Sequence, residues 1–268
     1  MNPALSAPLD VKLMNVTASA LLLVFAGLVL AVLLGWATRH PVFAIRSITV
    51  QGEVVHTNAV TLRANVMPQL SGSLFTLDLA QARSAFEALP WVRRAVVRRE
   101  FPNRLRVQLQ EQHTAAFWGA QDESMLVNNF GEVFEANVGE VEQDNLPRLV
   151  GPDGQAAQTL QMYRELVSQF AVLDAALDQL ELSASGGWRA TLDSGAVIEL
   201  GSGTPAEVAA RVQRFAATLT QVASRYGRHA DAVESADLRY AQGYALRLKG
   251  VSTLAAASSK TSNPQTNR

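Results

Sequence analysis

The chain has 268 residues, of which 48% are hydrophobic and 18% charged, and its formal net charge is −1. This composition can fill a folded core, and it argues against a disordered chain and against a nucleic-acid binder that depends on bulk positive charge. The sequence has no cysteine, which excludes disulfides, thiolate metal sites and a cysteine nucleophile.

An uncharged segment near the N-terminus, Val16 to Ala37, predicts a membrane-spanning helix. About 22 helical residues at 1.5 Å each extend roughly 33 Å, enough to cross a bilayer core of about 30 Å. A helix also pairs its own backbone groups in lipid, and Trp36 occupies the place of an interfacial aromatic. The segment is therefore interpreted as a permanent single-span anchor.

Two other interpretations of this segment are weaker, and its orientation is open. A buried core helix rarely runs this long without a charge. A cleaved signal peptide could end near Val42 to Ala44, but the apolar run is longer than is usual for such a peptide. The flanking charges are Lys12 on one side and Arg39 and Arg46 on the other. They do not fix the direction, because a long downstream domain translocates largely regardless of charge.

The region after the anchor predicts a small α+β unit in which two helices cover one face of a three-stranded sheet. Asp78 is the expected N-cap of the second helix, and Pro90 ends it. The expected order is β-α-α-β-β: strand Ala44–Gln51, helix Thr57–Val66, an extended link Leu74–Leu77, helix Asp78–Leu89, and strands Trp91–Arg99 and Arg104–Gln110.

From Gln112 onward many short strands and two helices are expected, which indicates a mixed β domain. Thr204 and Pro205 are typical of a helix N-cap followed by the first helical position. The expected strands are Ala115–Trp118, Met125–Asn128, Glu132–Phe134, Gln179–Ser185, Trp188–Leu192, Ala196–Leu200, Ala232–Tyr240 and Tyr244–Leu248, with helices at Thr159–Leu173 and from Thr204 onward.

The expected organisation is thus α+β with a single N-terminal transmembrane helix. A tail over residues 1–15, expected to be disordered, precedes the transmembrane helix at 16–38, and the two domains cover 43–111 and 112–250. Residues 251–268 are rich in Ser, Thr, Ala and Asn and are expected to be disordered.

No pattern in the sequence indicates catalysis. The four histidines, at positions 40, 56, 113 and 229, stand at neither helical nor hairpin spacing to one another, so no metal site is predicted. Nucleophile-elbow, zinc-protease and phosphate-loop motifs are absent from the sequence. We expect no enzyme activity, no cofactor and no small-molecule substrate.

Two surfaces are candidates for binding a partner. The densest charge comprises Arg93, Arg94, Arg98, Arg99, Arg104 and Arg106. It is either the solvated face of two strands or a docking surface for acidic protein or lipid headgroups. In the second case Arg93, Arg94, Arg98 and Arg99 are the expected docking residues. Nucleic acid is not expected there, because no aromatic stacking pattern accompanies the arginines.

The second candidate is the terminal strand, Tyr240 to Leu248, which ends the folded region and lacks Lys or Pro before Lys249. A terminal strand tends to lie at a sheet edge, where its unpaired backbone groups can accept a partner strand. The other interpretation is an edge that the chain itself covers.

Five groups of short motifs follow one another along the chain behind the N-terminal anchor. They are Leu89–Val92 with Val97–Leu105, Val107 and Glu111; Leu126–Asn128 with Gly131–Phe134; Leu146–Leu149 with Gly151 and Pro152; Trp188 with Leu192–Gly195; and Asp237–Tyr240 with Gly243. Each motif is modest alone, but in this order they resemble the FtsQ/DivIB family of bacterial cell-division proteins, which contain a POTRA domain.

The resemblance implies a POTRA domain followed by a β domain, both periplasmic, on a single-pass inner-membrane protein with a cytoplasmic N-terminus, located at the division septum. It implies a non-catalytic scaffold that recruits the bitopic proteins FtsB and FtsL, links to septal peptidoglycan synthesis, and contacts other divisome membrane proteins through the POTRA domain and the anchor.

For the terminal strand, the resemblance implies partner binding by strand addition. Arg239 would be a charge partner, Tyr240 the aromatic anchor and Gly243 the point of close approach, with Gln242 beside them. The family often has an aromatic late in this strand, where this chain has Leu248, with Tyr244 as the nearby aromatic. The chain also lacks the basic residue that usually follows Gly201.

Two other functions agree less well with the sequence. A POTRA-type chaperone or assembly factor for envelope proteins usually precedes a transmembrane barrel, and no long series of alternating barrel segments follows Glu111. A membrane-anchored envelope enzyme would need a catalytic constellation that the sequence lacks.

Overall fold

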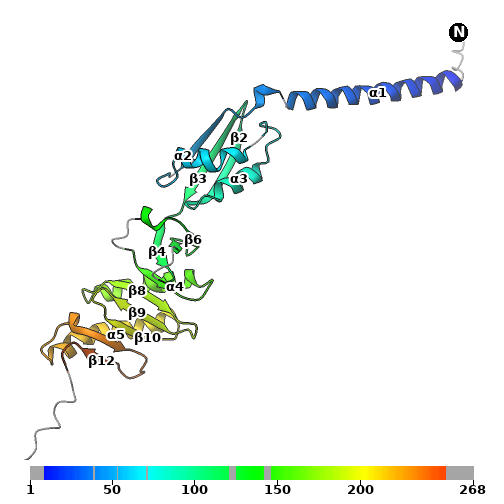
Figure 1. The fold of residues 1–268 in the computed structure, drawn as a ribbon. Helices are drawn as coiled ribbons and strands as arrows, with labels where there is room; N and C mark the ends of the chain where they lie inside the picture. The colour runs from blue at the N-terminus through cyan, green and yellow to red at the C-terminus, as the bar shows by residue number, and fades with distance from the viewer. Residues whose placement is uncertain are drawn as a thin grey trace, which may run out of the picture. The chain divides into compact units, whose positions relative to one another are not determined.

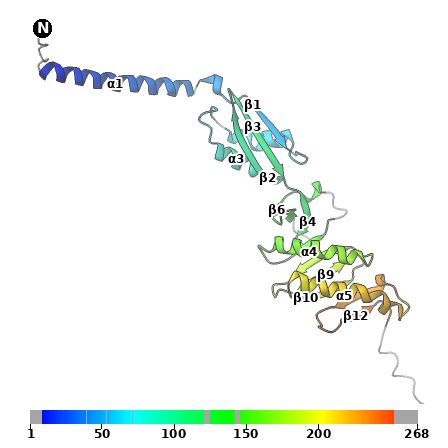
Figure 2. The ribbon, with the colours of Figure 1, turned by 180° about the vertical axis from the view of Figure 1, so that it is seen from behind.

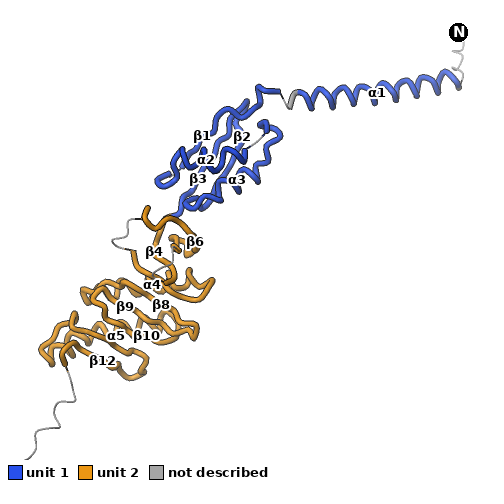
Figure 3. The backbone as a smooth tube through the Cα atoms, in the orientation of Figure 1, with its two compact units in different colours: residues 1–112 blue, residues 113–268 orange. Residues whose placement is uncertain are grey.

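The structure is a computed structural model of the chain and describes residues 9–38, 40–52, 54–70, 72–120, 125–141 and 146–251. The chain forms two compact units, residues 1–112 and 113–268 (Figure 3). The disordered tail expected from residue 251 lies, apart from that first residue, outside the described residues.

The first element is the helix α1, Leu9–Thr38 (Figure 1). Its stretch from Asp10 to Trp36 is long and apolar enough to cross a membrane, with a mean hydropathy of 2.7. The Thr17 hydroxyl donates to the carbonyls of Leu13 and Met14, at 3.1 and 3.0 Å, so this polar group is satisfied within the helix.

The expectation of an unstructured tail up to Asn15 is wrong for residues 9–15, which are helical. The helix begins directly after Pro8 in the sequence, and Asp10 lies in its first turn. Proline is poorly tolerated inside a helix, and a carboxylate near the N-terminus favours the helix dipole. The rest of the tail, residues 1–8, lies outside the described residues.

The sheet of the first unit has the order β1-β3-β2, with β1 parallel and β2 antiparallel to β3. The helices α2 and α3 cover one of its faces, as Figures 1 and 2 show from opposite sides. This confirms the expected order β-α-α-β-β. Its elements are η1 Pro41–Phe43, β1 Ser47–Gly52, α2 Ala59–Asn65, η2 Met67–Gln69, α3 Leu79–Glu87, β2 Val92–Glu100 and β3 Arg104–Glu111.

Local signals place these elements as expected. The Asn58 side chain caps α2 by accepting from the Thr61 N–H at 2.8 Å, and Asp78 caps α3 by accepting from the Ala80 N–H at 2.8 Å. Gly52 ends β1 at φ +120°, and a Cβ there would clash with the carbonyl oxygen of Leu109. Only glycine fits this position.

The expected extended link Leu74–Leu77 is wrong, because this segment is a tight turn. The Leu77 N–H donates to the carbonyl of Ser73 at 2.9 Å. The Arg99 guanidinium donates to the carbonyls of Leu74 and Leu77 at 2.6 and 2.7 Å. These distant donors stabilise the turn, and no local pattern in the sequence announces them.

A buried carboxylate anchors the loop between β1 and α2. The Glu111 side chain is 3% exposed and accepts from the backbone N–H groups of Val55, His56 and Thr57 at 2.9, 3.1 and 2.8 Å. Burial alone raises the pKa of Glu111, but hydrogen bonds from Thr57 and from the backbone of Val55 and His56 outweigh it, so the pKa of this carboxyl lies below its usual value. Glu111 therefore holds the loop to the last residue of β3.

The second unit is built on one nine-stranded sheet of order β12-β11-β10-β9-β8-β7-β4-β5-β6. The pairs β10–β11, β7–β8 and β4–β7 are parallel, and the other neighbours are antiparallel. Its elements are β4 Thr114–Trp118, β5 Met125–Asn128, β6 Val133–Glu135, η3 Val138–Glu140, β7 Arg148–Val150, α4 Ala156–Ala171, β8 Leu177–Leu182, β9 Trp188–Leu192, β10 Val197–Gly201, α5 Pro205–Ser224, η5 Ala230–Ala232, β11 Val233–Asp237 and β12 Ala245–Leu248.

The core of the second unit lies between this sheet and the helices α4 and α5. Inward residues alternate along β8, β9 and β10, and Phe170 of α4 and Phe215 of α5 are buried against them. Thr204 and Glu207 form a capping box at the start of α5. The α+β class with a mixed β domain and two long helices is confirmed.

We predict that Glu111→Gln lowers the free energy of unfolding by about 1–3 kcal/mol, because the neutral amide leaves buried N–H donors poorly paired. The carboxylate's contribution should be complete above its unfolded-state pKa and should be lost as the pH falls through its lower folded-state pKa. Urea unfolding at neutral and acidic pH measures both effects. The control is Glu100→Gln, which removes a surface carboxylate paired with Arg106; equal losses in the two variants would contradict this role of Glu111.

Candidate partner-binding surface at the terminal strand

The strand β12 lies at one edge of the nine-stranded sheet, and among the described residues its only neighbour is β11. It has four residues, with neither Pro nor Lys among them. An edge with unpaired backbone groups and no such protection can accept another strand. The second candidate surface of the sequence therefore coincides with an open edge.

The backbone of β12 has one side bonded to β11 and one side open. The Lys249 N–H donates to the Ala232 carbonyl at 2.8 Å. Since backbone groups alternate along a strand, those of Ala245 and Arg247 also face β11, and those of Leu246 and the N–H of Leu248 face outward. The Leu248 carbonyl accepts from Val251 at 3.2 Å. The open edge thus centres on the peptide groups of Leu246.

The side chain of Leu248 is not on this surface. It is 5% exposed and belongs to the core cluster formed with α5 and β11. Side chains alternate between the two faces of a strand, and this position points to the helices. Leu248 was expected among the partner-binding residues, but its side chain is buried in the core, and only its backbone N–H faces the open edge.

Tyr240 and Tyr244 lie in the loop between β11 and β12, so the expected strand over residues 240–248 is too long. The reason is Asp237, whose carboxylate accepts from the Arg239 N–H at 3.1 Å. This local bond competes with the strand ladder and turns the chain. Tyr240 is 58% exposed, so its ring is available for contact.

The charge of Arg239 is already paired within the chain. Its Nε and Nη2 donate to the two carboxylate oxygens of Asp237, at 2.8 and 2.6 Å. This hydrogen-bonded pairing raises the pKa of Arg239 and lowers the pKa of Asp237. A Cβ at Gly201 would lie 3.0 Å from the Arg239 Cγ, so glycine there allows the arginine stem to cross β10. A partner carboxylate would have to compete with Asp237 or bind the same guanidinium beside it.

The rest of the loop is fixed to α5. The Tyr244 ring packs edge-on against Phe215, with 5.1 Å between ring centroids, and its hydroxyl lies 2.9 Å from that of Thr218. The half-buried Tyr244 is therefore mainly a loop anchor. Gln242 is exposed, and a Cβ at Gly243 would meet no atom within 4 Å. These two residues face open space, and the fold itself gives no steric reason for glycine at 243.

The arginine cluster lies on β2 and β3, and it divides into arginines that are bound within the chain and arginines that are exposed and have no such bond within the described residues. Arg99 is bound to the turn carbonyls described above, Arg106 pairs with Glu100 at 2.7 Å, and the half-buried Arg93 already has a partner. Arg94 and Arg98 are exposed. Only these two of the four expected docking residues have the character of a free basic surface.

Two of the four histidines, His56 and His40, make contacts within the fold. His56 stacks on Trp91 with 3.9 Å between ring centroids, and its Nδ1 lies 3.6 Å from the Glu111 carboxylate. His40 accepts from the Val42 N–H at the start of η1. Within the described part of the chain no group of side chains has the composition of a metal site.

The sequence did not indicate a charged ladder across the outer face of the second sheet. Arg189 on β9 donates to Glu199 on β10 at 2.7 Å and to Glu181 on β8 at 3.5 Å. The three residues are opposite one another in the register. Alternation along each strand is enough to place these three side chains on the outer face. Only the register shows that they lie side by side across the three strands.

The comparisons with known proteins agree with this architecture. Residues 43–112 match the FtsQ-type POTRA domain, and residues 116–239 match the C-terminal domain of the cell division protein FtsQ/DivIB. The chain is 39% identical over 246 residues to cell division protein FtsQ of Thiomonas arsenitoxydans, covering 91% of this chain and 89% of that protein.

Two further relatives have the same name. Cell division protein FtsQ of Burkholderia pseudomallei is 38% identical over 243 residues, covering 90% of this chain and 94% of the relative. That of Shewanella oneidensis is 35% identical over 223 residues, covering 83% and 80%. The likeness therefore extends over both units.

We predict that Leu248→Ala lowers the free energy of unfolding of the second unit by about 2–4 kcal/mol, because it leaves a cavity in the core. Chemical denaturation followed by tryptophan fluorescence measures this loss. Val172→Ala is the control, since this side chain is 77% exposed and its removal should cost little. If Leu248→Ala left the free energy of unfolding unchanged, this would contradict the placement of the Leu248 side chain in the core.

Proposed function

This chain belongs to the FtsQ/DivIB family of cell division proteins, and from that premise we propose that it is a non-catalytic scaffold of the divisome. It recruits FtsB-like and FtsL-like bitopic division proteins and links them to septal peptidoglycan synthesis. One partner binds by adding a strand to β12.

The observation that carries this proposal is the open edge at β12. The outward N–H and C=O groups of Leu246, with the outward N–H of Leu248, offer the hydrogen bonds that strand addition requires. The edge is short, so backbone bonds alone would give weak binding. Side chains beside the edge must supply the remaining affinity and the specificity.

Tyr240 is the best placed side chain for that task. It is a large aromatic in the loop that leads into β12, and its exposure leaves most of the ring for a partner. Buried tyrosines are frequent hot spots of protein interfaces. Next to it Arg239 is held in place by Asp237, which makes it a preorganised donor for a partner carboxylate. Gln242, Gly243 and the edge of Tyr244 complete the surface.

The remaining features of the proposal concern location. The apolar helix α1 anchors the chain in the inner membrane, with the N-terminus in the cytoplasm and both folded units in the periplasm at the septum. The POTRA domain and the anchor contact other divisome membrane proteins, and Arg94 and Arg98 are the exposed basic residues that β2 offers them. The support for this orientation is family membership.

We predict that Tyr240→Glu weakens binding of the periplasmic segment of an FtsB-like partner by at least about ten-fold, which corresponds to about 1.4 kcal/mol. The assay is titration of the labelled segment against the full chain in nanodiscs. The matched control is Tyr226→Glu, which changes a tyrosine of similar exposure, 54%, at the end of α5. Undiminished affinity in Tyr240→Glu would contradict the proposal.

Strand addition itself makes a second prediction. Leu246→Pro removes an outward N–H of β12 without removing a bond to β11, because the groups of this residue face the open edge. Because the half-buried Leu246 side chain packs against the core, the variant should unfold somewhat more easily but remain folded, and it should lose most of its affinity for the same segment. Leu246→Val, which retains the N–H, should bind nearly as the parent does. Tight binding by the proline variant would show that the partner contacts side chains only.

A further inference from the structure

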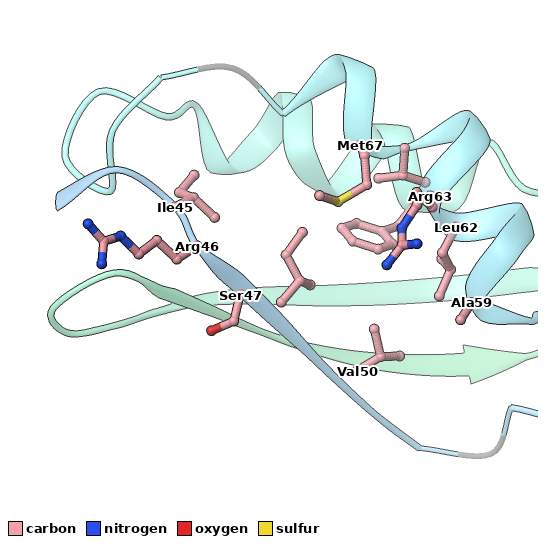
Figure 4. A pocket seen from close by; sticks show the side chains of 11 residues that line it. Ile45, Arg46, Ser47, Val50, Ala59, Leu62, Arg63 and Met67 are labelled. Carbon is pink, nitrogen blue, oxygen red and sulfur yellow. The ribbon is translucent and has the colours of Figure 1, made fainter. Parts of the chain in front are cut away.

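A second open edge lies in the POTRA domain, beside an apolar groove between β1 and the helix α2 (Figure 4). The groove has a volume of about 350 Å³. Ile48 and Val50 of β1 line one wall, and Leu62 of α2 and Met67 of η2 line the other. Ile48, Val50 and Leu62 are only half-buried, and Met67 is exposed. The helices thus leave apolar surface of β1 uncovered.

The free side of β1 has the backbone groups to bind a strand. The Arg46 N–H donates to the Asn103 carbonyl at 3.0 Å, and β1 pairs with β3 in a parallel register. By alternation the groups of Ile48 and Val50 face β3, and those of Ser47, Thr49 and Gln51 face outward. Within the described residues no strand covers this edge. The six residues of β1 include no charge, no Pro and no bulge, so the edge lacks the usual protection against pairing.

Two arginines flank the groove without a counter-ion. Arg46 extends past the end of the groove near Ile45, and Arg63 lies beside Leu62 on α2 (Figure 4). Both are exposed, and among the described residues neither forms an ion pair. No carboxylate lines the groove. Its charge is therefore positive, in contrast to the near-neutral chain as a whole.

The groove also lies close to the anchor along the chain. Nine residue steps separate Thr38, the last residue of α1, from Ser47, the first of β1. An extended chain covers at most about 3.5 Å per residue, so β1 begins within roughly 32 Å of the end of the helix. The occupant must reach this membrane-proximal zone.

We propose that the β1–α2 groove binds an extended, acidic segment of a second membrane protein, which adds to β1 as a strand. The segment places alternate apolar side chains in the groove and carboxylates near Arg46 and Arg63. This site is distinct from β12 and from the arginines of β2, and it does not depend on the proposed binding at either. An anionic lipid headgroup would satisfy the arginines but has no backbone ladder to pair with the groups of Ser47, Thr49 and Gln51.

The test uses the full chain in phosphatidylcholine nanodiscs and a labelled peptide of sequence Glu-Val-Thr-Val-Thr-Val-Glu with blocked ends. We expect it to bind at least about ten-fold more tightly than the same peptide with lysine at both ends. The double variant Arg46→Glu with Arg63→Glu should lose this preference. The matched control, Arg94→Glu with Arg98→Glu on the opposite edge strand, should retain it. Equal binding of both peptides, or loss only in the control variant, would overturn the proposal.

Thr49→Pro separates strand addition from charge attraction. It removes an outward N–H and leaves both arginines and the β1–β3 bonds in place. We expect it to abolish peptide binding, whereas Thr49→Ala should bind as the parent does; unchanged binding to the proline variant would overturn the proposal. If Thr49→Pro unfolds the domain, the peptide preference of the double variant Arg46→Glu with Arg63→Glu still tests the proposal. Binding to phosphatidylglycerol vesicles that depends on the two arginines, without binding of the acidic peptide, would assign the groove to lipid instead.

Discussion

The need of every peptide N–H and C=O group for a hydrogen-bond partner organises this protein. The helix α1 satisfies these groups internally, as a segment entering lipid must. The two sheets satisfy them between strands, and at the loop before α2 a buried carboxylate, Glu111, accepts from three consecutive N–H groups. Within the part of the chain that the structure describes, the edge strands β1 and β12 keep unpaired backbone groups, and both binding proposals rest on these edges.

The two edges offer different chemistry. At β12 the open stretch is short, and an exposed tyrosine and a paired arginine stand beside it. At β1 the open stretch is longer, an apolar groove runs beside it, and its two arginines have no counter-ion within the described residues. A partner strand that made only backbone hydrogen bonds could bind at either edge. The side chains that flank each edge are what would distinguish one partner from another.

Much of the fold follows from local signals in the sequence. Alternation predicted β1 and β3, apolar steps of three and four predicted α3, α4 and α5, and capping residues such as Asp78 and Thr204 marked helix starts. Two of the expectations failed for different reasons, one because of a partner distant in sequence and the other because of a local bond that ends a strand. The turn at Leu74 depends on Arg99, and β11 ends early because Asp237 binds the chain two residues on.

The candidate site was predictable as a region but not in its details. The sequence identified the last strand, and the resemblance to the FtsQ/DivIB family drew attention to Tyr240. Which face Leu248 presents, and that Arg239 is paired within the chain, depend on register and on tertiary contacts. For the same reason the groove beside β1 has no sequence signature, since side chains from β1, α2, η2 and α3 form it and its two arginines come from different segments.

Amide hydrogen exchange on the β12 edge tests the central claim most directly. With an FtsB-like partner segment bound, the Leu246 amide should exchange at least about ten-fold more slowly, because a partner carbonyl now accepts its N–H. The Arg247 amide, which faces β11 in the free chain, should change little. Saturating partner binding with unchanged exchange at Leu246 would contradict strand addition at β12.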